Sequence, residues 1–216
     1  MSKYAVVDLE MCSVPRSMQE VFNCKNELIQ IGAVLLDENL EITDTFQTYI
    51  APEFGHLTPF IENLTGITAA DLEGAPKAAE AFELFGNWLP DDVTFVSWSD
   101  NDERQIRKEM EAKGICNPRV NKGKECWTDC QIMFADKLET GKHYRLSEAL
   151  VLANIDFDEN IHNALIDAQN TALLFARLTL DPDFELIEGF VAEGEESESL
   201  TYNPFADFFK KYGYVS

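Results

Sequence analysis

The chain has 216 residues and a formal net charge of −22, from 39 acidic and 17 basic side chains. This length suits one domain that buries a core without disulfides, and the apolar and charged fractions, 45% and 26%, are ordinary for a soluble globular protein. The acidic balance argues against nonspecific binding of polyanions because its long-range field repels phosphates, but it does not exclude a local phosphate site.

Several classes of protein are disfavoured at this stage. No apolar run approaches the ~20 residues of a membrane span, and the first residues lack the pattern of a signal peptide. The five cysteines form an odd set without the spacing of a small secreted domain, so we expect reduced thiols. We therefore predict a cytoplasmic protein with no membrane partner.

In the first half of the chain, strands are predicted before helices. Apolar and alternating patterns predict strands at 3–9, 27–36 and 40–50, and their short connections favour an antiparallel start. Helical spacing follows at 59–64 and 76–89.

The second half begins with an apolar strand at 93–98 and is otherwise helical. Helices are expected at 102–113, 147–153 and 163–178, and a further helix runs through Leu138 from a cap at Thr128 or Asp129. The order of elements fits an α/β fold with a mixed central sheet, antiparallel in its first three strands and flanked by helices.

The C-terminal residues differ in composition from the rest. We assign residues 1–180 to the main domain and 181–216, with nine acidic residues and two lysines, to an acidic extension. Its segment 202–209 is too aromatic for a free tail. It either packs on the domain, which we favour, or docks a protein partner.

A pair of carboxylates follows the first strand. Residues i and i+2 of a strand point to the same side, so Asp8 and Glu10 lie side by side, an arrangement that suits Mg²⁺ or Mn²⁺. An Asp-x-Glu triplet is weak on its own, because others begin at Asp71 and Asp183. Only Asp8 follows an apolar strand, so we interpret the other two as surface.

A histidine and an aspartate mark the start of the last predicted helix. We place His162 in the loop and Asn163 at the helix cap, so that Asp167 projects from the second turn. A histidine beside a carboxylate-bound metal can take a proton from water at neutral pH. The alternative, a surface histidine beside a cap, becomes the minority reading once Asp8 and Glu10 are considered.

A third acidic site lies where the strand at 93–98 gives way to a helix, a usual place for functional carboxylates in α/β sheets. Asp102 shares a helix face with Ile106 and Met110 and should look toward the sheet. Asp100 is better read as a residue of the turn or the cap.

Together these segments resemble the three motifs of the DnaQ-like, or DEDDh, 3′–5′ exonucleases. The resemblance spans about residues 3–179 and is nearest the exoribonuclease-like branch, which has a tryptophan in its second motif. Two departures bear on substrate shape, since Met11 and Ser99 stand where the family often has threonine and glycine. The motifs that carry the resemblance are Asp8-Leu9-Glu10, Trp98-Ser99-Asp100-Asn101-Asp102 and His162-x-Ala164-x-x-Asp167.

The resemblance implies a ribonuclease H-like fold and hydrolysis of phosphodiester bonds with two Mg²⁺ or Mn²⁺ ions. By resemblance, Asp8, Glu10, Asp102 and Asp167 are the metal ligands, and His162 is the general base. Glu10, Met11 and His162 would lie beside the terminal nucleotide, although a core role for Met11 is nearly as plausible. The implied partner is the 3′ end of single-stranded RNA or DNA, with RNA favoured, and the product is a nucleoside 5′-monophosphate.

Two questions stay open. Residues 104–124 hold seven basic and two acidic residues, and they either guide the phosphate backbone, with Lys142 or Arg145, or form a solvated surface. The chain could also be a non-catalytic nucleic-acid-binding or scaffold module, or a proofreading or accessory exonuclease subunit docked through 202–209.

Overall fold

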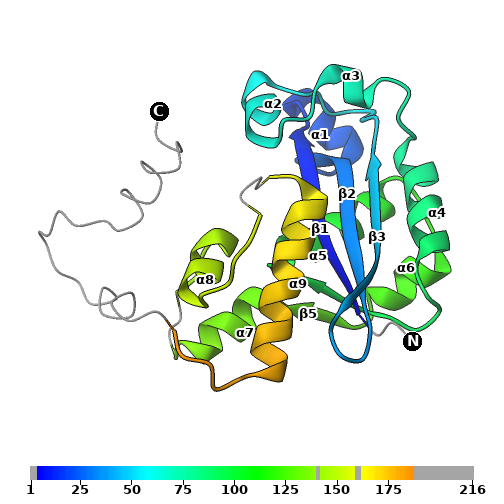
Figure 1. Cartoon of the computed structure of the whole chain (residues 1–216). Helices are drawn as coiled ribbons and strands as arrows, with labels where there is room; N and C mark the ends of the chain where they lie inside the picture. Colours follow the sequence, from blue (N-terminus) through cyan, green and yellow to red (C-terminus); the bar gives the residue numbers. More distant parts are fainter. Residues whose placement is uncertain (1–3, 140–141, 159–161, 187–216) are drawn as a thin grey trace, which may run out of the picture. The chain divides into compact units, whose positions relative to one another are not determined.

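The computed structural model describes residues 4–139, 142–158 and 162–186 (Figure 1). The strands form one mixed sheet in the order β3-β2-β1-β4-β5, in which β1–β2 and β2–β3 are antiparallel and β1–β4 and β4–β5 are parallel. The predicted α/β fold with an antiparallel start is therefore confirmed. In chain order the elements are β1 (Tyr4–Ser13), α1 (Arg16–Phe22), β2 (Asn26–Leu36), β3 (Ile42–Tyr49), α2 (Pro59–Thr65), α3 (Ala69–Leu72), α4 (Ala78–Trp88), β4 (Thr94–Ser97), α5 (Asp100–Ala112), α6 (Pro118–Gly123), β5 (Trp127–Asp129), α7 (Cys130–Lys137), α8 (Leu146–Leu152) and α9 (Ala164–Leu180).

Different helices cover the two faces of the sheet (Figure 1). The odd-numbered apolar residues of β1 pack with residues of α4, α5 and α6 in one large core cluster. Helix α9 crosses the other face over β1 and β2, where Tyr4 packs edge-on against Phe175 with ring centroids 5.1 Å apart. Since side chains alternate along a strand, Asp8 and Glu10 share the face of Tyr4, beneath α9.

Four short elements, α1, α3, α6 and β5, are not among the predicted strands and helices. Helix α1 buries only Phe22, so its sequence carries little periodicity. Strand β5 has three residues and is defined by its pairing with β4. The helix expected to follow a cap at Thr128 or Asp129 begins at Cys130, and Asp129 is its cap: the Asp129 side chain accepts the Ile132 N–H at 2.9 Å.

A buried ionic cluster ties α5 to the start of β2. The Lys113 Nζ lies 2.7 Å from Glu27 and 3.0 Å from Glu109, and both glutamates are fully buried. Glu27 also accepts the backbone N–H groups of Glu53, Phe54 and Gly55, which fixes the loop after β3. Burial raises the pKa of Glu27, but Lys113 and these backbone donors outweigh it and the net shift is downward.

Replacing Lys113 with methionine should lower the free energy of unfolding by about 3–5 kcal/mol, because two buried carboxylates lose their cation. Urea unfolding measures this loss. The matched control is Lys122→Met, whose partner Asp92 is 93% exposed, and it should cost no more than about 1 kcal/mol. Equal losses in the two variants would show that the Lys113 cluster adds nothing beyond a surface ion pair.

The predicted extension lies mostly outside the described residues, and so does its aromatic segment 202–209. Of its first residues, Phe184 is buried, with the Lys137 Nζ 4.5 Å and the Arg177 guanidinium 5.0 Å from its ring centroid. Across the described ranges, no helix is both long enough and apolar enough to span a membrane.

Candidate active site

The sheet opens between β1 and β4 at the point where the acidic residues gather. The two strands pair only from Tyr4 to Val6 on β1, whereas β1 continues along β2 to Ser13. Asp8 and Glu10 were expected at the end of a strand, but they lie within β1, which pairs with β2 beyond them. They lie past the end of the pairing between β1 and β4. There the carboxyl ends of the parallel strands diverge and leave room for a ligand.

Helix α5 brings the second acidic position to this opening. Its cap is Ser99, whose hydroxyl accepts the Asn101 N–H at 3.4 Å, and Asp102 lies in the first turn with 6% of its surface exposed. The backbone of Leu9 lowers the pKa of both Asp8 and Asp102, against the larger effect of burial. As predicted, Asp102 faces the sheet, while Asp100 pairs with Arg104 on the outside of the helix.

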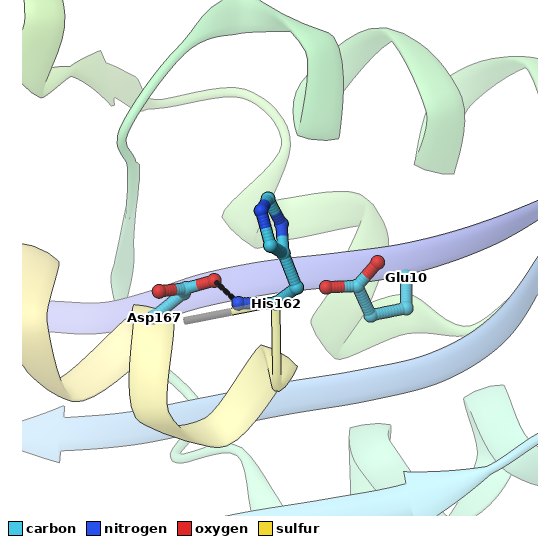
Figure 2. A group of neighbouring side chains, drawn as sticks. All are labelled: Glu10, His162 and Asp167. Carbon is cyan, nitrogen blue, oxygen red and sulfur yellow. Dashed lines mark hydrogen bonds between the residues drawn. The ribbon is translucent and has the colours of Figure 1, made fainter. Parts of the chain in front are cut away.

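The start of α9 supplies the histidine and the last carboxylate (Figure 2). Asn163 caps the helix as predicted, and its side chain accepts the Leu165 N–H at 3.1 Å. The Asp167 carboxylate accepts the His162 backbone N–H at 2.8 Å. His162 has φ of 69°, in the left-handed region that costs a non-glycine residue energy, so this contact helps to hold a strained turn.

Strand β2 fixes how closely α9 approaches the carboxylates. Gly32 pairs with Asp8, and a Cβ at Gly32 would lie 2.1 Å from the backbone of Ala164, so only glycine fits there. Gln30 pairs with Glu10, and its carboxamide oxygen accepts the Ala164 N–H at 3.0 Å. The sequence analysis did not assign Gln30 a role, although it is the only polar side chain between Leu28 and Leu36.

Three side chains converge closely enough to share a cation. One ligand atom each from Glu10, His162 and Asp167 lies within 4.8 Å of the other two. Figure 2 shows the Glu10 and Asp167 carboxylates on either side of the His162 backbone, on β1 and α9 respectively. Asp8 and Asp102 lie near enough to interact electrostatically with Asp167.

Burial favours the protonated forms of all four acids, and repulsion by neighbouring carboxylates adds to it for Asp8, Glu10 and Asp102. Burial and three neighbouring carboxylates raise the pKa of Asp8 well above its ordinary value. Burial, with Asp167 and Asp102, raises the pKa of Glu10 to about 8. Burial also raises the pKa of Asp102 to about 7 and that of Asp167 to about 6, although backbone hydrogen bonds oppose it in both.

His162 is shifted in the opposite direction. Burial and the positive charge of Arg145 lower its pKa, so the imidazole is neutral at pH 7 and able to accept a proton. Arg145 was grouped in the sequence with residues that could guide phosphates, and the structure adds this electrostatic contact with His162.

The donor set fits divalent cations. Four carboxylates that raise one another's pKa are a costly arrangement, and no cation is prominent among the groups that shift them. Hard oxygen ligands with an adjacent imidazole suit Mg²⁺ or Mn²⁺, whose charge would relieve the repulsion. Mutual repulsion of this kind is therefore an argument for a metal site.

Other predicted contacts are less central. Met11 is partly exposed and packs against the core, so its contact with a base stays a prediction. Trp127 is partly buried and packs edge-on against Phe95 of the core, with ring centroids 5.0 Å apart.

Several known proteins are similar to this chain in sequence. The exonuclease family model RNase T matches residues 5–175. The DNA polymerase III subunit epsilon of Aquifex aeolicus is 31% identical over 160 residues, which cover 71% of this chain and 72% of that protein. ERI1 exoribonuclease 2 of Danio rerio is 29% identical over 182 residues, which cover 72% of this chain but only 32% of that longer protein.

Solved structures show the same fold. The nuclease domain of 3′hExo, a DEDDh family member bound to rAMP, superimposes with a TM-score of 0.67 at 21% identity and covers 85% of this chain and 94% of that one. Cell-death related nuclease 4 gives a TM-score of 0.68 at 19% identity and covers 85% and 65%. The ribonuclease H-like fold implied by the sequence motifs is thus confirmed.

Proposed function

Since this chain belongs to the RNase T exonuclease family and is a 3′–5′ exonuclease, we propose that its substrate is single-stranded RNA. The observation that supports hydrolysis at this site is the convergence of Glu10, His162 and Asp167. They lie beside Asp8 and Asp102 in the opening between β1 and β4. The preference for RNA is supported by the relatives named exoribonucleases, among them those of Danio rerio and Rattus norvegicus.

We assign the four carboxylates to two divalent cations, Mg²⁺ or Mn²⁺. Asp8 would contribute to both sites because it interacts with the other three acids, Glu10 and Asp167 would complete one site, and Asp102 would serve the second. When bound, the ions lower the pKa of water and neutralise charge on the phosphate.

The residues of the chain then have separate tasks in one hydrolysis. Neutral His162 accepts a proton from the attacking water, whose oxygen bonds to phosphorus as the bond to the 3′ oxygen of the preceding nucleotide breaks. The released nucleotide keeps the phosphate on its 5′ carbon. The Asp167 side chain accepts the His162 backbone N–H, and the Gln30 side chain accepts that of Ala164. These bonds fix the position of His162 relative to Glu10.

Glu10 is also a reason to expect RNA and not DNA as the substrate. Its carboxylate can accept a hydrogen bond from a hydroxyl of the terminal ribose, and RNA offers one hydroxyl more than DNA. Sites that bond a hydroxyl discriminate against an analogue that lacks it.

Matched RNA and DNA strands of one sequence, labelled at the 5′ end, test this preference with Mg²⁺ and then with Mn²⁺. We expect kcat/KM for RNA to exceed that for DNA by about tenfold or more. Equal rates would contradict the RNA assignment, and degradation of neither strand would contradict the proposal as a whole.

A second candidate function is proofreading of DNA, favoured by the 31% identity to a polymerase subunit. It would require a polymerase partner, for which segment 202–209 is the candidate contact. Faster removal of a mismatched than of a paired 3′ nucleotide from a DNA primer would favour this candidate over RNA trimming.

A further inference from the structure

Most basic residues of the stretch 104–124 already have partners. Arg119 pairs with Asp91 at 2.8 Å and Lys122 with Asp92 at 3.1 Å, while Lys113 lies in the buried cluster. Arg104 and Arg107 bond to acids one turn earlier on α5. Within the described ranges, Lys108 is in no ion pair, so its charge is free for a ligand.

Lys108 lies on the wall of a polar cavity of about 370 Å³ between α1, the start of β2 and α5. A second lysine of the same cavity, Lys25, is also without an ion pair among the described residues, and both are exposed. Four amide side chains complete the polar lining, those of Gln19, Asn23, Asn26 and Gln105.

Two of the amides are held in place by the fold. Gln105 is 7% exposed, and its side-chain amide donates to the Asn26 carbonyl at 3.1 Å and to Glu109 at 2.9 Å. Gln19 donates to the Val14 carbonyl at 2.7 Å. These bonds fix the wall but occupy both N–H groups of Gln105, so the donors for a ligand are the side-chain amides of Asn23 and Asn26. With the two lysines at the mouth, they suit an anion that also accepts hydrogen bonds.

Helix α5, which carries Asp102, also lines the cavity. Gln105 and Lys108 follow Asp102 by three and six residues on α5, about 4.5 and 9 Å along the helix axis. Asn26 pairs with Ser13, which is three residues or about 10 Å beyond Glu10 on β1.

We propose that this cavity binds a backbone phosphate of the substrate strand, upstream of the nucleotide being removed. The inference rests on the proposed function, because it needs a strand whose 3′ end lies at the carboxylates. A volume of about 370 Å³ is at the small end of ligand sites, enough for a phosphate and part of its nucleotide. Two local charges in a chain of −22 hold the strand near its end while the rest of the surface repels it.

The test compares two double charge reversals. Lys25→Glu with Lys108→Glu alters the cavity, whereas Arg119→Glu with Lys122→Glu makes the same change of charge at residues already paired with acids. Binding of a fluorescent single strand is measured in chelator, so that it does not depend on hydrolysis. Hydrolysis of the p-nitrophenyl ester of uridine 5′-monophosphate, which has no upstream phosphate, reports whether the active site is intact.

We expect the cavity variant to bind the strand about tenfold more weakly and to hydrolyse the ester like the unmodified chain. Because the variant neutralises one phosphate fewer of the strand, raising the salt from roughly 50 to 200 mM should weaken binding by the unmodified chain by a factor about 2.6 times larger than for the variant. Unchanged strand affinity in the cavity variant, or an equal loss in the comparison variant, would overturn the proposal.

A free nucleotide carries the same phosphate chemistry, so a further arm measures inhibition by uridine 5′-monophosphate. If the cavity variant weakens this inhibition but not strand binding, the cavity holds a free nucleotide and the strand proposal is wrong. If the unmodified chain hydrolyses neither ester nor strand, the proposed function fails, whereas strand binding in chelator still decides the cavity.

Discussion

Replacing Asp8 with asparagine is expected to lower exonuclease activity by about 10³-fold or more, equivalent to about 4 kcal/mol of transition-state stabilisation. Asp8 interacts with all three other carboxylates, and its loss would weaken both proposed metal sites. The rate is measured on a labelled strand with excess metal.

The same substitution should stabilise the metal-free chain. Burial and repulsion raise the pKa of Asp8, so the folded state holds its proton more tightly than the unfolded state does. The gain from asparagine should be small near pH 4, where the acid is protonated in the folded state and still about half protonated in the unfolded state. It should grow as the pH rises above the unfolded pKa and be larger at pH 8.

Urea unfolding in chelator at both pH values measures this gain. Asp183→Asn, an exposed acid in another Asp-x-Glu triplet, is the matched control and should change neither rate nor stability. A stability loss at pH 8 in the Asp8 variant would contradict the view that these acids repel one another until a cation binds.

Replacing His162 with alanine should lower kcat by about 10²–10⁴-fold, the usual contribution of a general base, and leave metal affinity nearly unchanged. The acid limb of the pH–rate profile should also disappear. Because burial and Arg145 lower the pKa of His162, that limb should lie below pH 6.5 in the unmodified chain, with activity lost as the imidazole becomes protonated.

Metal affinity decides between two roles for His162, since its ring lies within reach of the same ion as Glu10 and Asp167. Isothermal titration with Mn²⁺ measures it. A large loss of affinity with a smaller loss of kcat would make His162 a ligand instead of the base. His143→Gln is the control: His143 is an exposed histidine whose Nδ1 bonds to Gln131 at 2.8 Å, and its replacement should alter neither quantity.

The sequence predicted the long elements because their signals are local. Alternation and helical spacing located β1, β2, β3 and α9 to within a few residues. It did not predict β5, whose three residues become a strand only beside β4, or the extension of β1 to Ser13, which depends on pairing with Asn26. Such pairing is tertiary information that a pattern within one segment does not carry.

The acidic positions and the cap at Asn163 were predicted for a similar reason, since each follows from the geometry of its own strand or helix. The supporting roles of Gln30 and Gly32 were not, because they arise only where α9 meets β2. The basic stretch was ambiguous until the structure showed which side chains are paired. Charge counted along a chain does not separate Lys108, in no described ion pair, from Arg119, which Asp91 already holds.

We propose that the carboxylates around Asp8 hold divalent ions and that, with these ions bound, the chain removes nucleotides from a 3′ end. The most direct measurement follows a single strand labelled at its 5′ end during incubation with the purified chain and Mn²⁺, before and after chelation. We predict that the strand shortens stepwise from its 3′ end. Shortening should stop in chelator and resume when metal is restored. Hydrolysis that continues in chelator, or immediate release of the labelled 5′ nucleotide, would contradict it.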